Sequence, residues 1–444
     1  MEDKKFVVCS CPIASRSGYG DHSRDIVRGL IEKYPEWDIK VIPQRWGGTP
    51  LNSLQQGVDD DLISRLWVQP QLPQQPDIWM QITVPNEFNP VGKFNIGITA
   101  GIETTVADAT WIEGLNKMDL NIVPSEFSKN VLQNSTYQKM DEKTKQSVGE
   151  LKLTKPIEVV FEGLDLDVWK KVKEIPKSLN DEIKHIPESF CYLFTGHWLQ
   201  GEPGQDRKDI GMMLKTFMEN FKNMKNPPAL VLKTSSATFS VIDRNECIKK
   251  IEGIRRSVDA KTLPNVYLLH GDLTPEEMNA LYNHPKMKAM ISFTKGEGYG
   301  RPLAEFARTG KPVLASNWSG HVDFLNPKYH LLLPGKLTPV HKSAQQKGMI
   351  NEGSQWFTVD YQMAGGIIKE VHKNYKKFAE KSRGSAHYMK TEFSLDKMND
   401  VMKVVIDRAL ESKPQQTTLK LPKLTKSDGP APTLKLPKLK KVSK

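Results

Sequence analysis

Glycines and carboxylates lie close together in one stretch of the sequence, TKGEGYGRPLAE (residues 294–305). Its glycines allow the backbone to approach a ligand closely, and Pro302 suits the first position of a helix, where a backbone N–H has no partner anyway. The free N–H groups that open such a helix favour an anion. Glu297 in the loop and Glu305 in the first turns of the helix would both point into a cleft mouth, where carboxylates accept hydrogen bonds from sugar hydroxyls. The alternative is a tight turn whose glutamate merely suits a helix N-terminus.

The elements before this stretch alternate between short apolar strands and amphipathic helices, which is typical of a parallel α/β sheet. The opening unit is a strand, a loop that contains Gly18 and Gly20, and a helix. The strands of this first block are expected at residues 4–10, 38–44, 77–83, 93–100, 120–125 and 157–163. Helices are expected at residues 22–34 and directly after Ser125, which suits an N-cap.

A second block of the same kind begins near Ser189. Its strands are expected at residues 189–196, 228–234, 265–271, 289–294 and 312–316. Its helices are expected at residues 209–221, 243–257, 275–283 and 302–308. Two such blocks would face one another across a cleft, and open α/β sheets bind ligands outside the carboxyl ends of their strands.

These patterns divide the chain of 444 residues into four parts. We expect a Rossmann-like domain at residues 1–170, a second one at 171–393, and a helix at 394–412 that is a candidate to pack back on the first domain. The formal net charge is +11, but residues 413–444 contain nine Lys and one acid, so +8 lies in this tail and +3 in the body. The tail repeats TLKLPKL and has too few apolar residues to form a core, which predicts a disordered basic arm.

The composition argues against several classes of protein. No run of about 18 apolar residues occurs and the charged start is unlike a signal peptide, so we expect a cytoplasmic protein without a transmembrane segment. Cys9, Cys11, Cys191 and Cys247 lack paired metal-ligand spacing and are expected to be buried and reduced. The acidic run at residues 59–61 resembles a metal site, but its polar surroundings favour a solvated loop.

The segment EGYGRPLAEFARTGKPVLASNWSGHVDFL (residues 297–325) resembles the signature of family 4 retaining glycosyltransferases. In that signature two glutamates with seven residues between them open a glycine-rich loop and a helix, and here they are Glu297 and Glu305. The resemblance extends from about residue 5 to about residue 410. Five other segments resemble the family and occur in the same order along the chain, at residues 18–20, 122–132, 159–169, 196–217 and 230–233.

The resemblance implies the GT-B fold, in which two Rossmann-like domains face a cleft and the second holds most of a nucleotide-sugar donor. Position by position, Arg207 and Lys208 match the basic pair that meets the donor diphosphate. Glu305 matches the glutamate that binds the ribose, and Glu297 matches the one near the transferred sugar. The other candidates for donor binding are Gly18, Gly20, Lys233, Gly298, Tyr299, Gly300 and Arg301. Neither a metal nor a cofactor is expected, because fixed cations would stabilise the charge that grows on the leaving diphosphate.

These candidates also have plain structural interpretations. Arg207 and Lys208 are alternatively a solvated loop pair, Lys233 a lysine at a strand end, and the first glycines a tight turn. Many family members place a histidine beside the sugar, after a strand like KFNIGITA (residues 93–100), where this sequence has Glu103. Glu103 is either a charged group near the anomeric carbon, an acceptor ligand or a buried structural residue.

The acceptor is the part of the function that the sequence leaves open. The resemblance predicts retaining transfer of a sugar from a UDP- or GDP-sugar to a hydroxyl of a glycan, a lipid or a hydroxylated DNA base. The first-domain residues that would shape acceptor choice are Arg16, Tyr19, Arg45, Trp46 and Trp79. The basic tail at 413–444 is a candidate tether for a polyanion, namely nucleic acid or an anionic surface, or a motif for a protein partner. The alternatives are a non-catalytic nucleotide-sugar-binding scaffold that acts through this tail, and a sugar-phosphate phosphorylase.

Overall fold

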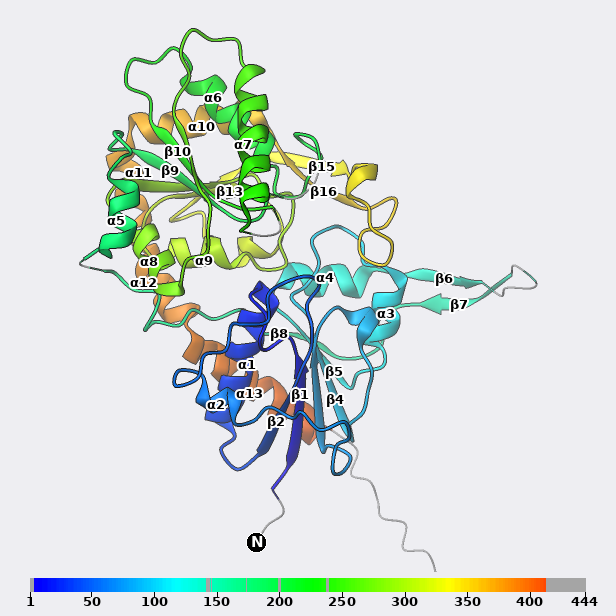
Figure 1. Ribbon diagram of the computed structural model, residues 1–444. Coiled ribbons are helices and arrows are strands. Elements are labelled where there is room, and N and C mark those ends of the chain that lie inside the picture. Colours follow the sequence, from blue (N-terminus) through cyan, green and yellow to red (C-terminus); the bar gives the residue numbers. More distant parts are fainter. Residues whose placement is uncertain are drawn as a thin grey trace, which may run out of the picture.

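The computed structural model describes residues 4–140, 144, 146–172, 174–198, 201–236 and 239–412. Two α/β units lie one above the other, and each contains one parallel six-stranded sheet (Figure 1). The first sheet has the order β2-β1-β3-β4-β5-β8, with β1 (Phe6–Cys11), β2 (Asp38–Pro43), β3 (Ile78–Ile82), β4 (Phe94–Ile98), β5 (Leu120–Val123) and β8 (Ile157–Val159). The second has the order β11-β10-β9-β12-β13-β14, with β9 (Cys191–Thr195), β10 (Ala229–Lys233), β11 (Val266–Leu269), β12 (Met287–Ser292), β13 (Val313–Ser316) and β14 (Leu331–Leu333).

Helices lie between most consecutive strands, because parallel neighbours in a sheet need a long crossover connection. Those of the first unit are α1 (Gly18–Lys33), α2 (Asp60–Ile63), α3 (Ala109–Leu115) and α4 (Glu126–Asn134), with a 3₁₀ turn η1 (Pro85–Glu87). Those that follow are α5 (Lys177–Ile183), α6 (Ile210–Phe221), α7 (Val241–Arg256), α8 (Pro275–Asn283), α9 (Arg301–Ala307), α10 (Tyr361–Lys373), α11 (Tyr375–Ser382), α12 (Ser385–Glu392) and α13 (Leu395–Glu411), with η2 (Gly320–Asp323) and η3 (Lys342–Ala344).

Inner strands of both sheets, including β1, β3, β4 and β10, are buried along their whole length, because apolar clusters cover both faces. In the first unit one cluster joins Ile26 and Leu30 of α1 to the sheet, and another joins Trp111 and Leu115 of α3 to the opposite face. Strands buried on two faces appear in the sequence as short continuous apolar runs rather than as alternating patterns. This property makes the strands of both units visible in the sequence.

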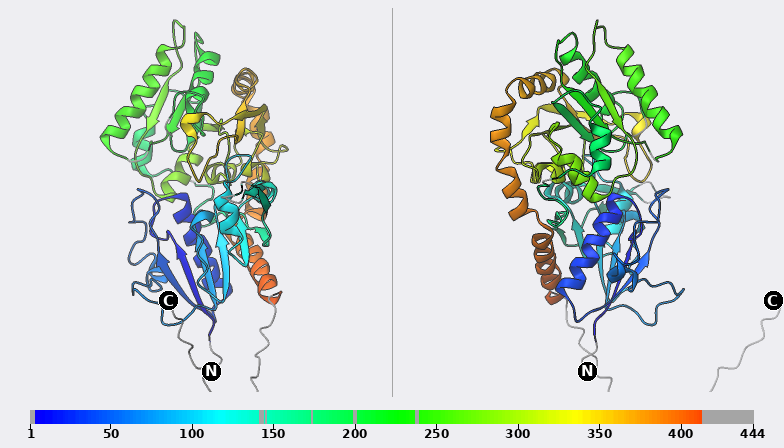
Figure 2. Two further views of the ribbon diagram at one scale, coloured as in Figure 1. Left: turned by 90° about the vertical axis from the view of Figure 1, so that its right-hand side faces the viewer. Right: turned by 60° about the vertical axis from the view of Figure 1, so that its left-hand side comes forward.

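The last helix, α13, returns to the first unit and packs against α1 (Figure 2). Met402 lies in the same apolar cluster as the buried face of α1. A Cβ at Gly29 of α1 would lie 2.3 Å from Oδ1 of Asn399, so glycine permits the close approach of the two helices. The hydroxyl of Tyr34 donates a hydrogen bond to Oδ1 of Asp407 at 2.9 Å. The chain therefore crosses between the units twice, once before β9 and once before α13.

Two antiparallel hairpins extend this framework. The pair β6 (Tyr137–Met140) and β7 (Ser147–Leu151) projects away from the first unit (Figure 1). The pair β15 (Gly335–Pro339) and β16 (Gln355–Val359) belongs to the second unit and reaches across to the first. Trp111 Nε1 donates to the carbonyl of Gly348 in the intervening loop at 2.9 Å. The backbone N–H of Thr105 donates to the carbonyl of Gln355, also at 2.9 Å.

Three helices begin earlier than the sequence patterns predict: α7 begins at Val241 rather than at residue 243, and α1 and α9 also start early. The loop expected around Gly18 and Gly20 is the first turn of α1, because Ser17 acts as the N-cap and accepts a hydrogen bond from the Gly20 N–H. In α9 the first helical residue is Arg301 rather than Pro302, and Gly300 precedes it with φ +103°. Glycine adopts this left-handed conformation without strain, so it turns the loop into the helix.

The remaining global expectations concern cysteines, membrane spans and the tail. All four cysteines are free and buried, which confirms their expected packing role. None of the helices in the described ranges is both long and apolar enough to cross a membrane. The basic arm expected at 413–444 lies outside the described residues.

Candidate functional site

Glu297 lies in the loop between β12 and α9 and is only 7% exposed. Its Oε1 accepts hydrogen bonds from Lys208 Nζ and from Thr294 Oγ1, the latter at 2.6 Å. Its Oε2 accepts from Arg207 Nη1 at 3.1 Å. The backbone N–H of Glu297 donates to Ser319 Oγ at 2.9 Å. Side-chain and backbone bonds together hold the carboxylate in one orientation.

The basic pair reaches Glu297 because the loop before α6 is bonded to the glutamate loop through the backbone. The carbonyl of Arg207 accepts from the Lys295 N–H at 2.7 Å, and its guanidinium donates to the carbonyl of Gly296 at 2.8 Å. Lys208, the next residue, then faces the carboxylate directly. Ninety residues separate Arg207 from Glu297, so only folding brings them together.

The charges around Glu297 favour its ionised form. Burial alone raises the pKa of this carboxyl, but Lys208 and Arg207 lower it to about 2. Burial lowers the pKa of Lys208, and Glu297 opposes that effect. Burial also acts to lower the pKa of Arg207, but Glu103 and Glu297 outweigh it and the pKa is raised. At neutral pH Glu297 can therefore accept hydrogen bonds but has no proton to donate.

Two glycines bring the glutamate loop into direct contact with the first unit. A Cβ at Gly298 would lie 1.8 Å from the carbonyl oxygen of Ala100, and one at Gly296 would lie 2.0 Å from the carbonyl oxygen of Glu103. Ser125, the N-cap of α4, donates its hydroxyl proton to the carbonyl of Gly298 at 2.7 Å. A side chain at either glycine would push the two units apart.

Glu103 extends this group of charges from the first unit. Its Oε2 lies 2.9 Å from Nε of Arg207, and its side chain is 37% exposed. Burial raises the pKa of the Glu103 carboxyl, and Arg207 opposes the rise. The four residues expected to act in catalysis, Glu297, Arg207, Lys208 and Glu103, are thus linked by ion pairs into one Glu297 cluster.

Glu305 lies in α9 and has different partners from Glu297. Its Oε2 accepts from the Tyr282 hydroxyl at 3.2 Å, and its Oε1 lies 3.9 Å from Nε of Arg301. Burial raises the pKa of Glu305 to about 7, with Arg301 opposing the rise. Arg301 itself reaches into the first unit, where its Nη1 donates to Oδ2 of Asp25 in α1 at 2.7 Å.

Lys233 ends β10 at the carboxyl edge of the second sheet and is buried. Its Nζ donates to the carbonyl of Gly271 at 2.5 Å and lies 5.3 Å from the ring centroid of Phe239. Burial lowers the pKa of Lys233 to about 8. The hydroxyl of Thr234, the next residue, is buried and has no hydrogen-bond partner within the described ranges. A cation and an unsatisfied hydroxyl thus belong to consecutive residues at a strand end where α/β sheets bind ligands.

The glycines at the start of α1 lie at the edge of the first unit that approaches the glutamate loop. Gly20 is buried, and a Cβ there would lie 2.0 Å from a backbone carbonyl oxygen of the preceding loop, whereas Gly18 has open space around it. Tyr19 lies between them and accepts a hydrogen bond from the Ala100 N–H at 3.1 Å. The Tyr19 ring stacks on Trp46, with 3.8 Å between the ring centroids.

The other residues expected to shape acceptor choice differ in exposure and in their contacts. Arg45 is exposed, and Arg16 forms an ion pair across to Asp272 of the second unit. Trp79 is only 7% exposed and packs in an apolar cluster. It therefore supports the wall of the first unit from inside rather than offering a ring to a ligand.

The acidic run at 59–61 is not the solvated loop that its surroundings predict. It opens α2, and Asp59 is buried. Arg28 of α1 pairs with Asp59 at 2.5 Å and with Asp61 at 3.0 Å. Within the described ranges, no three His, Cys, Asp or Glu side chains form a group that could hold a metal ion.

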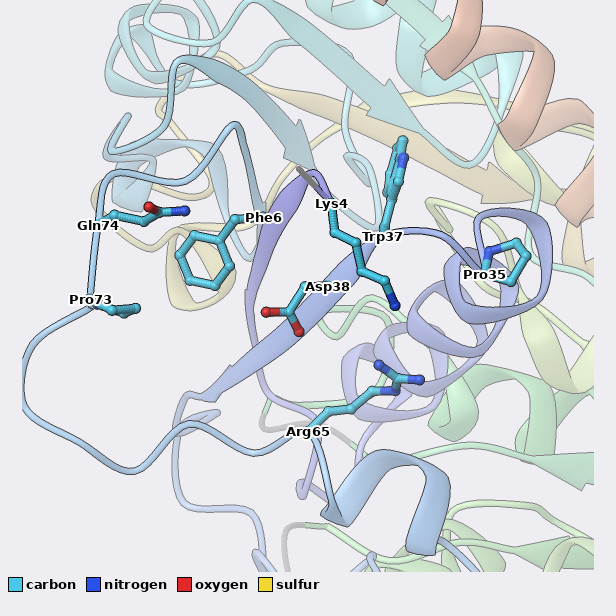
Figure 3. Close-up of a pocket in the computed structure, with 8 residues that line it drawn as sticks. All are labelled: Lys4, Phe6, Pro35, Trp37, Asp38, Arg65, Pro73 and Gln74. Carbon is cyan, nitrogen blue, oxygen red and sulfur yellow. The ribbon is translucent and has the colours of Figure 1, made fainter. Parts of the chain in front are cut away.

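Two surface pockets lie away from the glutamate loop. One, of about 420 Å³, is at the amino ends of β1 and β2 and is lined by Lys4, Phe6, Pro35, Trp37, Asp38, Arg65, Pro73 and Gln74 (Figure 3). Another, of about 670 Å³, lies between α5 and the turn before β12. Both are at the end of the sheet opposite to the carboxyl ends of the strands. They take no part in the Glu297 cluster.

A comparison with protein-family models gives no match, and neither does a comparison with curated protein sequences. Solved structures do match. Sucrose-phosphate synthase from Thermosynechococcus elongatus has a TM-score of 0.62 at 12% identity, covering 92% of this chain and 100% of that one. A glycosyltransferase from Rickettsia africae gives 0.58 at 14% identity, covering 93% and 100%. Anabaena HepE in complex with UDP and glucose gives 0.56 at 12% identity, covering 90% and 99%.

These likenesses run over almost the whole chain and show its fold. The fold is GT-B, with two Rossmann-like domains, and the expectation from the sequence is confirmed. At such low identity the likeness concerns architecture, and activity has to be argued from the site.

Several residues of the site are not among those predicted from the sequence. Thr294 has a usable signal, because its hydroxyl lies two residues after the end of the buried strand β12. Asp25 has none, because 276 residues separate it from Arg301. The same is true of Tyr282, whose hydroxyl reaches Glu305 from a neighbouring helix.

Proposed function

We propose that this protein is a retaining, metal-independent glycosyltransferase of the cytoplasm, which moves a sugar from a UDP- or GDP-sugar to a hydroxyl acceptor. The observation that carries the proposal is the Glu297 cluster. One ionised glutamate lies between Arg207 and Lys208, in a glycine loop that touches both units of a GT-B fold. Residues of both units therefore converge at one place.

The basic residues suit the leaving group of such a transfer. When the bond between the sugar and the diphosphate breaks, negative charge grows on the diphosphate oxygens, and preorganised cations stabilise it. Arg207 and Lys208 carry more N–H donors than their bonds to Glu297, Glu103 and Gly296 use. Lys233 adds a third cation at a strand end.

The ionised Glu297 suits the sugar rather than the leaving group. A carboxylate with a pKa of about 2 accepts hydrogen bonds from sugar hydroxyls and stabilises positive charge at the anomeric carbon. It does not protonate the diphosphate, which is a good leaving group without a proton. In the retaining step the anomeric carbon loses its bond to the diphosphate oxygen and gains one to the acceptor oxygen on the same face. The acceptor proton passes to the departing diphosphate.

We assign Glu305 to the donor ribose and the first unit to the acceptor. Arg16, Tyr19 and Trp46 lie on the side of the first unit that approaches the second, and we keep the exposed Arg45 as a further candidate. The acceptor classes are those that the sequence suggests, namely a glycan, a lipid or a hydroxylated DNA base. We propose that the basic residues of 413–444 hold a polyanionic acceptor or surface by charge.

The proposal is tested by turnover of UDP- and GDP-sugars with the full chain, using mass spectrometry of products formed with glycans, a lipid fraction and hydroxymethylated DNA. Glu297→Gln is expected to lower turnover by about 100-fold or more, because it removes the anion but keeps the shape. Glu252→Gln, an exposed change in α7, is the matched control. Equal background turnover in all three proteins, with nucleotide binding retained, would identify a scaffold. Turnover that needs inorganic phosphate would identify a phosphorylase.

A further inference from the structure

One buried group of charges at the contact between the units surrounds Glu305, the residue assigned above to the donor ribose. We call it the Arg301 cluster, and it consists of Arg301 with the carboxylates of Asp25, Glu162 and Glu305. Nη1 of Arg301 lies 2.7 Å from Asp25 and 3.6 Å from Glu162, and its Nε lies 3.9 Å from Glu305. Asp25 and Glu162 belong to the first unit, whereas Arg301 and Glu305 belong to α9 of the second.

Acids outnumber bases in this cluster. The side chains of all four members are at most 16% exposed, and one guanidinium faces three carboxyl groups. His22 of α1 does not add a positive charge, because burial and then Arg301 lower its pKa to about 3. The carboxylates therefore compete for the same guanidinium, and the one that holds it most closely leaves the others without a strong partner.

The geometry shows which carboxylate holds the guanidinium. Arg301 makes its short bond to Asp25, across the contact between the units, and lies farthest from Glu305. Arg301 and Glu305 are four residues apart in one helix, a spacing at which oppositely charged side chains can pair, and they make a long contact of 3.9 Å. The first unit draws Nη1 of Arg301 toward Asp25 and Glu162, so its shorter contacts are not with Glu305.

We propose that Asp25 is a positioning residue for donor binding, which holds Arg301 away from Glu305 so that the Glu305 carboxylate stays free to accept the ribose hydroxyls of the donor. This inference rests on the ribose role assigned to Glu305 above. When α1 and α9 separate, Arg301 loses Asp25 and pairs with Glu305 in its own helix. A Glu305 that is engaged in this way competes with the donor.

The arrangement couples donor binding to contact between the units. If contact frees Glu305 for the donor, then by thermodynamic linkage the bound donor favours the contact by the same factor. Coupling between two sites of a protein is commonly worth about 5-fold to 150-fold in affinity. Arg301 is the physical link, since it is the one guanidinium shared by acids of both units in this cluster.

The test compares Asp25→Asn, the double variant Asp25→Asn/Arg301→Gln and a control, Glu36→Gln, all in the full chain at pH 8.5. Glu36 is an exposed acid just after the end of α1 that takes no part in the Arg301 cluster. Asp25→Asn is expected to raise the donor KM and the Kd for UDP or GDP about tenfold, with kcat within about twofold. The control is expected to change neither value. In the double variant no guanidinium competes for Glu305, so the donor KM is expected to be at least about threefold lower than in Asp25→Asn.

Each outcome supports or overturns the inference. A double variant that binds donor no better than Asp25→Asn overturns it, because Asp25 then acts only as structural support. An unchanged KM and Kd in Asp25→Asn overturn it as well. Asp25→Glu, which keeps the carboxylate, is expected to restore most of the donor affinity, and melting temperatures check that all variants are folded. A wild-type protein that binds neither nucleotide and transfers no sugar overturns the proposed function together with this inference.

Discussion

Two glutamates eight residues apart in the same loop and helix have opposite electrostatic surroundings. Glu297 pairs with two cations, Lys208 and Arg207, of which Arg207 also pairs with Glu103, and these cations lower the pKa of Glu297 to about 2. Glu305 shares the single guanidinium of Arg301 with two other carboxylates, and burial raises its pKa to about 7. Burial acts in the same direction on both. The number of cations per carboxylate decides the difference.

This difference assigns distinct tasks to two residues of the same type. Glu297 remains an anion through the physiological pH range and can stabilise positive charge beside it at any time. Glu305 titrates near neutral pH, so its ability to accept hydrogen bonds depends on its neighbours. The three predictions that follow disturb one side of the comparison at a time, beginning with the largest expected effect.

The largest effect is expected when Glu297 loses one of its cations. Lys208→Met is expected to lower turnover about 100-fold, because a preorganised charge at the leaving group is lost. It is also expected to raise the pKa of Glu297 toward its ordinary value, so the acid limb of the pH–kcat profile moves to higher pH. Steady-state kinetics across pH measure both changes. Lys225→Met, an exposed change after α6, is the control, and a turnover within twofold of wild type in Lys208→Met would contradict the prediction.

A smaller effect is expected from Glu305→Gln, and it concerns stability. The pKa of Glu305 is about 7 in the folded protein against an ordinary 4.5, so the folded state binds more protons between these values and the wild type loses stability as pH rises from 4.5 through 7. Glutamine removes this loss. The unfolding free energy of Glu305→Gln minus that of wild type is therefore expected to be about 2 kcal/mol more positive, in favour of the folded variant, at pH 8 than at pH 5. Denaturant unfolding at the two pH values measures it.

Glu297→Gln serves as the control of opposite sign for that experiment. The folded pKa of Glu297 is about 2, below the ordinary 4.5, so its contribution to stability is present above 4.5 and is lost as pH falls toward 2. Its replacement should destabilise the protein more at pH 8 than at pH 3. If the two glutamine variants respond to pH in the same direction, the proposed contrast between the clusters is wrong.

The smallest effect is expected from the ion pair between Arg16 and Asp272. This pair also joins the two units, but its side chains are 38% and 47% exposed. Solvent screens such pairs, so Asp272→Asn is expected to change stability by less than about 0.5 kcal/mol and the donor KM by less than twofold. Thermal melting and steady-state kinetics, run beside Asp25→Asn, measure the difference. A tenfold rise in KM for Asp272→Asn would show that any contact between the units has the same effect.

Local signals account for the elements that the sequence predicts well. Helix α8 has the expected bounds, residues 275–283, because Thr274 and Glu277 form a capping box and Pro275 occupies the first turn. Helix α4 begins directly after Ser125, whose side chain caps it. Each signal lies within a few residues of the boundary that it sets, so no tertiary contact is needed to read it.

The hairpins were not predicted, because their strands lack local signals. Strand β15 is GKLTP, which is largely exposed and has no regular apolar pattern. It is extended because it pairs with β16, with Gly335 opposite Val359. Helix α13 was visible as a helix, but its place against α1 depends on the fit of Gly29 to Asn399. Such pairings depend on partners far along the chain, which composition and periodicity do not contain.

By itself, the sequence determined two blocks of buried strands and a glutamate-glycine loop that leads into a helix, because these features depend on neighbouring residues. Through the resemblance, it also matched Arg207 and Lys208 to the basic pair that meets the donor diphosphate. Only the tertiary structure decided that this pair forms ion pairs with Glu297, and that Arg301 pairs with Asp25 of the first unit. The physical reason is that burial and charge pairing depend on side chains brought together from distant positions. Two glutamates of one sequence motif therefore differ in charge surroundings in the folded protein.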